Sequence, residues 1–130
     1  MPPAVKPVPV VPPSPKAAPG RDSVFEAVYF EFDHAEVRTQ DSARLASYAE
    51  YLKTHPGTRL LVVGYCDPLG SIEYNRALGW RRAENVRNRL MQHGVDGNRL
   101  ETFSYGSEAV TYDDPDLFWV ERRCGFQLLR

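Results

Sequence analysis

Hydrophobic positions in the first half of the chain change their spacing twice. Residues 24–32 are rich in aromatic and β-branched side chains, which predicts a strand. Between 39 and 54 the apolar residues recur at helical spacing, and Gly57 follows the end of that pattern. Residues 59–65 are almost all apolar, which indicates a strand buried on both faces.

The second half of the chain again alternates between helix and strand patterns. A helix is predicted from 72 to 93, with Ser71 as its N-cap and Gly94 as its stop. Strands are predicted at 100–105 and 123–129, separated by a polar loop and a short helical turn. The order β-α-β-α-β-(loop/turn)-β predicts an α+β fold, in which a mixed four-stranded sheet packs against two main helices.

Proline is concentrated at the start of the chain. Residues 2–19 hold eight of the 11 prolines, and most of the others there are Ala, Val and Lys. Such a composition favours an extended, polyproline-like segment over a packed element. We therefore predict a flexible linker at 1–22 and one globular domain at 23–130.

The net charge and the hydropathy of the chain restrict the classes of function that it can have. The net charge is −1, which gives no support for nucleic-acid binding. No apolar run approaches the roughly 18 residues that a membrane span needs, and the opening residues lack the pattern of a signal peptide. Any membrane contact is therefore expected through an anchor outside this chain.

Two cysteines, Cys66 and Cys124, lie at the ends of predicted strands. They can be two small buried hydrophobic residues, or they can form one disulfide in an oxidising compartment. The sequence has no His/Cys spacing typical of a zinc site, so neither a metal nor a cofactor is expected.

One charge falls on an apolar helical stripe. Arg82 lies four residues after Leu78 and four before Val86, so it shares their face of the predicted helix. A charge there needs a partner or a ligand. Asp67, at the end of the preceding strand, can form a structural ion pair with Arg82, or both residues can hold a zwitterionic ligand between them.

The block around these two charges resembles a known family signature. The matching residues are Gly64-Tyr65-Cys66-Asp67, Gly70, Glu73-Tyr74-Asn75, Ala77-Leu78-Gly79 and Arg81-Arg82-Ala83, supported by residues 28–33, 104–108 and 122–123. This signature resembles the OmpA C-terminal-like family, which includes OmpA, the peptidoglycan-associated lipoprotein Pal and the flagellar stator protein MotB. The Pal branch is the most similar.

The resemblance implies non-covalent binding of peptidoglycan through the diaminopimelate residue of its peptide stem. Asp67 would accept hydrogen bonds from the ammonium group, and Arg82 would bind the carboxylate. By the same resemblance, the other ligand-binding residues would be Asn75, Leu78, Phe32, Asp33 and Arg122.

Three positions depart from the family pattern. Tyr65 stands where the family usually has His, Glu121 where it usually has Asn, and Pro68-Leu69 replace a more polar pair. We expect Tyr65 and Glu121 to alter ligand affinity or choice.

The sequence therefore predicts a non-enzymatic anchor in the periplasm of a diderm bacterium, associated with the outer membrane. No nucleophile with a neighbouring base accompanies Asp33 and Asp67. The alternative is a protein-interaction module of the same fold, with a Tol-system type partner and weakened or altered wall binding.

Overall fold

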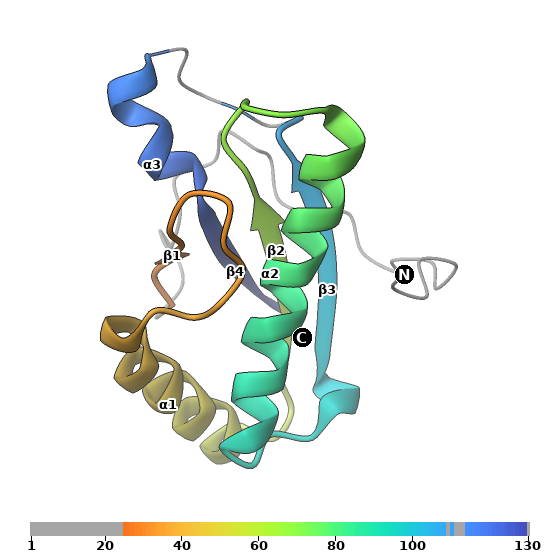
Figure 1. Cartoon of the computed structure of the whole chain (residues 1–130). Coiled ribbons are helices and arrows are strands. Elements are labelled where there is room, and N and C mark those ends of the chain that lie inside the picture. Colours follow the sequence, from red (N-terminus) through yellow and green to blue (C-terminus); the bar gives the residue numbers. More distant parts are fainter. Residues whose placement is uncertain (1–24, 109, 111–113, 130) are drawn as a thin grey trace.

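A computed structural model describes residues 25–108, 110 and 114–129 of the chain. Four strands, two long helices and three short helical segments make up this part (Figure 1). Their bounds in chain order are β1 (Val28–Tyr29), α1 (Thr39–Thr54), β2 (Arg59–Tyr65), α2 (Ile72–Gln92), η1 (Gly97–Arg99), β3 (Leu100–Gly106), η2 (Pro115–Leu117), α3 (Phe118–Glu121) and β4 (Arg123–Leu129).

The four strands form one mixed sheet in the order β1-β4-β2-β3. β4 lies antiparallel to both β1 and β2, with Gly64 of β2 opposite Cys124. β2 and β3 are parallel, with Val63 opposite Phe103, and α2 makes the crossover between them. The predicted α+β fold with a mixed four-stranded sheet is confirmed.

Both long helices lie on the same face of the sheet (Figure 1). Alternate residues of β2, including Leu60 and Val62, join α1 and α2 in the main hydrophobic core. The intervening residues, including Leu61 and Val63, form a second buried cluster on the opposite face. This explains why the β2 sequence is apolar at every position.

The bounds of α1, β2, α2 and β3 agree with the prediction within one residue, but the predicted strand at 24–32 is wrong in length. Only Val28 and Tyr29 pair with β4. Before them, the hydroxyl of Tyr48 accepts from the backbone N–H of Glu26 and donates to its carbonyl, which replaces strand pairing. After them, the chain turns at Asp33, whose φ of 59° lies in the left-handed region.

Ser71 caps α2 as predicted, because its hydroxyl accepts a hydrogen bond from the backbone N–H of Tyr74. Gly94 follows α2 with a φ of 101°, as expected of a helix stop. The N-cap of α1 is instead Arg38, whose side chain makes no capping bond.

Two glycines bring α2 against β2. A Cβ added to Gly64 would lie 1.9 Å from the carbonyl oxygen of Gly79, so the two backbones touch without side chains between them. This contact holds the first turns of α2 beside the end of β2. It therefore positions the residues that leave β2 relative to those that α2 carries.

The predicted linker, residues 1–22, lies outside the described residues. Within the described part, neither long helix combines the length and hydropathy required to cross a membrane.

Candidate functional site

A pocket of about 200 Å³ opens where β2 ends and α2 begins. Three segments build it: the turn after β1, the turn after β2, and the first three turns of α2. Its lining consists of Phe32, Asp33, Cys66, Asp67, Leu69, Gly70, Tyr74, Asn75, Leu78 and Arg82. Six of the seven ligand-binding residues predicted from the sequence thus lie around one pocket.

Asp67 is buried at the end of β2, and both of its carboxylate oxygens have partners. Oδ2 accepts from Nε of Arg122 at 2.7 Å, and Oδ1 accepts from the backbone N–H of Leu69 at 3.1 Å. These bonds fix the orientation of a negative charge at the pocket wall.

Arg82 is only 1% exposed and binds three backbone carbonyls. Nε donates to His34, one terminal nitrogen donates to Tyr65, and the other donates to Glu31, at 2.8 to 3.2 Å. Its guanidinium also lies over the ring of Phe30, 5.1 Å from the centroid. Arg82 therefore joins the turn after β1 to the end of β2.

The Asp67–Arg82 ion pair that the sequence left open is not formed in the described part of the chain; Asp67 pairs with Arg122. Of the five N–H donors of a guanidinium, the carbonyl contacts of Arg82 use three. One donor on each terminal nitrogen makes no hydrogen bond to the described residues. Burial lowers the pKa of Arg82, but an arginine stays protonated at neutral pH.

Asn75 and Leu78 form the buried side of the pocket on α2. The side-chain amide nitrogen of Asn75 donates to the backbone carbonyl of Asp67 at 3.4 Å, and the backbone carbonyl of Asn75 accepts from the thiol of Cys66 at 3.1 Å. Asn75 thus holds the turn that presents Asp67, while Leu78 adds apolar surface.

Phe32, Asp33 and Tyr74 lie at the exposed mouth. The hydroxyl of Tyr74 donates to Oδ1 of Asp33, which bridges α2 and the turn after β1. This hydrogen bond raises the pKa of Tyr74. The guanidinium of Arg122 lies 5.4 Å from the ring centroid of Phe32, so the seventh predicted residue contacts two of the other six.

Two predicted departures from the family pattern lie away from the pocket. Tyr65 is on the opposite face of the sheet, where it stacks with Tyr105 and lies beneath the guanidinium of Arg123. Glu121 is buried and pairs with Arg123, and does not pair with Arg122. Neither side chain lines the pocket, so an effect of Tyr65 or Glu121 on ligand affinity or choice would have to be indirect, and that expectation stays a prediction.

Both cysteines are free and buried in the structure, so the possible disulfide is not formed. Burial raises the pKa of the Cys66 thiol to about 11, and it raises the pKa of Cys124 as well. The thiol of Cys66 instead donates to the carbonyl of Asn75. Among the described residues, no group of His, Cys, Asp and Glu is arranged to hold a metal ion.

Sequence reasoning missed the roles of Tyr74 and Leu69. Tyr74 is three residues after the predicted N-cap, so it lies in the first turn of α2 beside the turn that carries Asp67. The backbone N–H of Leu69 donates to the carboxylate of Asp67. An Asp that begins a turn commonly accepts from the backbone two residues later, so this contact was predictable from the sequence.

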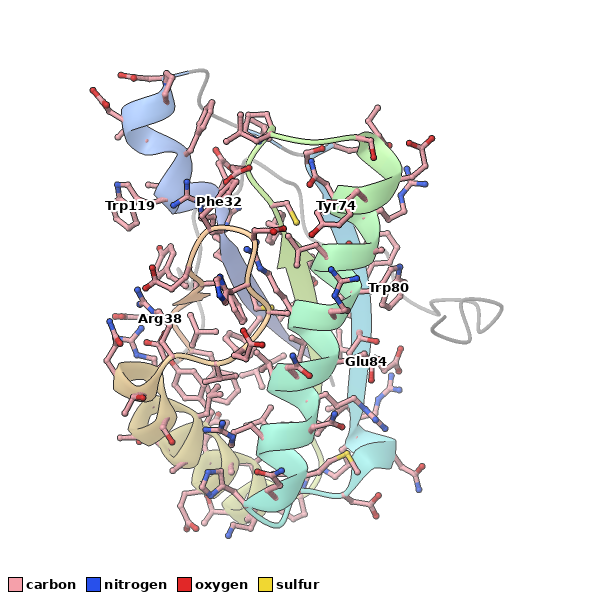
Figure 2. The ribbon with its side chains drawn as sticks, in the orientation of Figure 1. Phe32, Arg38, Tyr74, Trp80, Glu84 and Trp119 are labelled. Carbon is pink, nitrogen blue, oxygen red and sulfur yellow. The ribbon has the colours of Figure 1, made fainter. Side chains whose placement is uncertain are left out.

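Five of the six large hydrophobic side chains that are exposed in the described residues lie at this end of the domain, and the sixth, Met91, is in the last turn of α2. Figure 2 shows Phe32, Tyr74 and Trp119 at the same end of the molecule. Phe32 and Trp119 are 51% and 53% exposed, and Leu69 and Ile72 are also exposed near the pocket. We call these five residues, Phe32, Leu69, Ile72, Tyr74 and Trp119, the apolar rim.

The arrangement can therefore bind a small zwitterion. A buried carboxylate and a buried guanidinium line one pocket, each held by several hydrogen bonds, with apolar surface from Leu78 and Phe32 between and around them. Opposite charges fixed in one pocket favour a ligand that carries an ammonium and a carboxylate group on one carbon.

Known proteins share this sequence and fold. Residues 29–116 match the OmpA family. The peptidoglycan-associated lipoproteins of Brucella melitensis and Haemophilus influenzae are 34% identical over 113 residues and 42% identical over 101 residues. These alignments cover 82% and 76% of this chain, and the chain spans about two thirds of each relative, 67% and 66%.

A solved structure is also similar to this chain in both sequence and fold. The peptidoglycan-associated lipoprotein from Burkholderia pseudomallei superposes with a TM-score of 0.76 at 38% identity, covering 79% of this chain and 89% of that one. The family match spans most of the described domain, including the turn after β1 and the whole of the β2–α2 corner. The chain belongs to the OmpA family.

Proposed function

We propose that the pocket binds the peptide stem of peptidoglycan without making or breaking a covalent bond. The observation that carries this proposal is the placement of Asp67 and Arg82 on one pocket in a chain whose relatives are named peptidoglycan-associated lipoproteins. The ligand group is the zwitterionic end of the stem's diaminopimelate residue.

The two charges take complementary parts. An ionised carboxylate accepts about four hydrogen bonds, so Asp67 can bind an ammonium group while it keeps Arg122 and Leu69. Arg82 offers one N–H from each terminal nitrogen to the ligand carboxylate, in the paired geometry that guanidinium groups favour. Asp33 and Phe32 border the stem where it leaves the pocket.

This binding would anchor an envelope component to the cell wall in the periplasm. The proline-rich linker, residues 1–22, would connect the domain to the outer membrane or to another envelope protein, through an anchor outside this chain. A modest affinity at each site is sufficient, because many tethered copies and a repeating wall raise the effective concentration. The proposal assigns no catalytic step to the pocket.

A sedimentation assay with purified peptidoglycan tests the proposal. We expect the native chain to sediment with the wall and Asp67→Asn to remain largely in solution, since the substitution keeps the size of the side chain and removes its charge. Binding of a soluble stem peptide that carries diaminopimelate, measured by calorimetry, should be weakened at least tenfold, which equals about 1.4 kcal/mol.

Asp41→Asn is the matched control. Asp41 is 3% exposed against 5% for Asp67, and it also pairs with the Nε atom of an arginine, Arg38, at 3.1 Å. It lies in α1, away from the pocket. Equal sedimentation of the native chain and Asp67→Asn would refute the proposal, and equal loss in both variants would assign the effect to folding.

The apolar rim favours a second function, binding of a protein of the Tol-system type. Exposed aromatic and aliphatic side chains gathered at one end of a domain are typical of protein interfaces. Its test is Trp119→Ser, because Trp119 does not line the pocket. Loss of a Tol-type partner with unchanged peptidoglycan sedimentation would separate this function from wall binding.

A further inference from the structure

The sheet face that points away from α1 and α2 carries hydrophobic residues from three strands, between the polar side chains of Arg59, Glu101, Arg123 and Gln127. β2 contributes Leu61, Val63 and Tyr65, and β3 contributes Phe103 and Tyr105. Leu129 of β4 completes this set. We call these six residues the second face.

Register places the aromatic part of the second face at one edge. Val63 of β2 lies opposite Phe103 of β3 on one side and opposite Gly125 of β4 on the other. The rings of Phe103 and Tyr105 meet edge to face at 5.2 Å, and Tyr105 stacks on Tyr65 at 5.6 Å. Gly125 adds no side chain beside them, so aromatic rings dominate this part of the sheet.

A sheet face that meets water normally alternates with polar residues. Here Leu61 and Val63 are fully buried, and Phe103 and Tyr105 are half-buried, although both described long helices pack on the other face. The indole of Trp80 extends the aromatic surface at the β3 edge, 6.2 Å from Phe103 (Figure 2). The half-buried rings of Phe103 and Tyr105 therefore leave aromatic surface on this face that another segment can cover.

We propose that the proline-rich segment of the same chain, residues 2–19, docks on the second face. Proline-rich segments bind grooves and surfaces lined by aromatic side chains, because their preformed extended shape loses little entropy on binding. This segment offers prolines interleaved with Val and Ala, and carries no acidic residue. Its composition therefore matches the chemistry of the face.

The length of the proline-rich segment and the place where it joins the domain allow it to reach the second face. Phe25, the first described residue, packs against Tyr48 of α1 and Phe126 of β4, near the sheet edge formed by β1. Eighteen residues in polyproline form extend about 56 Å, whereas four strands span only about 14 Å across the sheet. A segment joined to the domain in this way reaches the face at millimolar effective concentration, so weak contacts are sufficient.

Docking would set the working length of the linker. With the segment bound, the domain is held close to whatever precedes it, and release of the segment lengthens the connection. The second face and the pocket lie on different parts of the domain, so this role does not depend on the ligand that the pocket binds.

Paramagnetic relaxation in the full chain tests the proposal. A nitroxide attached through Val8→Cys should label that site alone, since Cys66 and Cys124 are buried free thiols with raised pKa values. We expect loss of most of the signal intensity from Leu61, Val63 and Phe103, with little change at the exposed surface of α1. Replacing Pro7, Pro9, Pro12 and Pro13 by Gly in the labelled chain should restore these signals without touching the domain.

A nitroxide at Glu50→Cys, an exposed position of α1, is the control and should affect α1 but not the second face. Weak broadening spread evenly over the domain would overturn the proposal. Mixing spin-labelled chains with isotope-labelled chains tests docking between chains: broadening of the second face in that sample would show that the proline-rich segment of a second copy binds there, and would overturn docking within one chain.

Discussion

The Nε atom of Arg122 lies 2.7 Å from Oδ2 of Asp67, although 55 residues separate them in the chain. Arg122 lies between α3 and β4, and its guanidinium also lies against the ring of Phe32. A cation therefore holds the carboxylate that is proposed to bind the ligand's ammonium group. Asp67 is oriented before the ligand arrives, but part of its charge is already balanced.

We predict that Arg122→Ala weakens both the fold and stem binding. The substitution removes a charge-assisted hydrogen bond from a buried carboxylate, which should cost about 1–3 kcal/mol of unfolding free energy in urea titration. Arg122→Lys should recover part of this loss, because it restores the charge without the planar donor geometry.

Arg76→Ala is the control for Arg122→Ala. Arg76 also lies 2.7 Å from its partner, Glu108, but the two side chains are 46% and 45% exposed. An exposed pair of this kind contributes about 0–1 kcal/mol. Equal destabilisation by the two alanine substitutions would contradict the importance that we give to burial at Asp67.

Arg82→Ala should unfold the protein more readily than any change at the pocket mouth. It leaves the carbonyls of Glu31, His34 and Tyr65 without their donor, and each carbonyl that stays buried without a donor costs about 1–3 kcal/mol. Thermal and urea unfolding measure this directly. An unchanged midpoint would show that the three carbonyl bonds contribute little, and loss of binding in Arg82→Ala is interpretable only at temperatures where that variant is folded.

Gly64→Ala should separate α2 from β2. The new methyl group would lie 1.9 Å from the carbonyl oxygen of Gly79, and overpacking of a close backbone contact costs about 1–3 kcal/mol or more. Gly57→Ala is the control, because a Cβ there meets nothing within 4 Å. A matched pair of urea titrations compares them, and similar midpoints would contradict the close contact.

Because the thiols are buried, we predict that the folded protein loses stability at alkaline pH. Burial raises the pKa of Cys66 to about 11, so the folded state favours the protonated thiol relative to the unfolded chain. This contribution is fully present below the ordinary thiol pKa of about 8.5 and is lost as the pH rises toward 11. Urea midpoints measured across this range should therefore fall more steeply in the native chain than in Cys66→Ala.

Thiol titration checks the state of the same residues. We expect neither Cys66 nor Cys124 to react with a thiol reagent in the folded protein at pH 7, and both to react after denaturation without reductant. No reactive thiol after denaturation would show that the two cysteines are bridged.

Local patterns predicted most of the fold because each element carries its own signals. The apolar spacing of α1, the hydroxyl of Ser71 and the left-handed Gly94 act within a few residues, so sequence alone identifies them. The strand predicted before Asp33 is longer than β1, because the hydroxyl of Tyr48 in α1 forms hydrogen bonds with the backbone of Glu26. That competition involves residues 22 positions apart, and no local rule detects it.

The sequence by itself determined the corner at residues 64–83 and the residue types at the pocket: a carboxylate at the end of a strand, a guanidinium on an apolar helical stripe, and Asn75 and Leu78 between them. Only the tertiary structure decided the partners of those charges, since Arg122 and the carbonyls that bind Arg82 come from distant segments. It also decided the side on which Tyr65 lies. Both faces of β2 are apolar, so alternation could not distinguish them, and the contact between Gly64 and Gly79 turns Tyr65 away from the pocket.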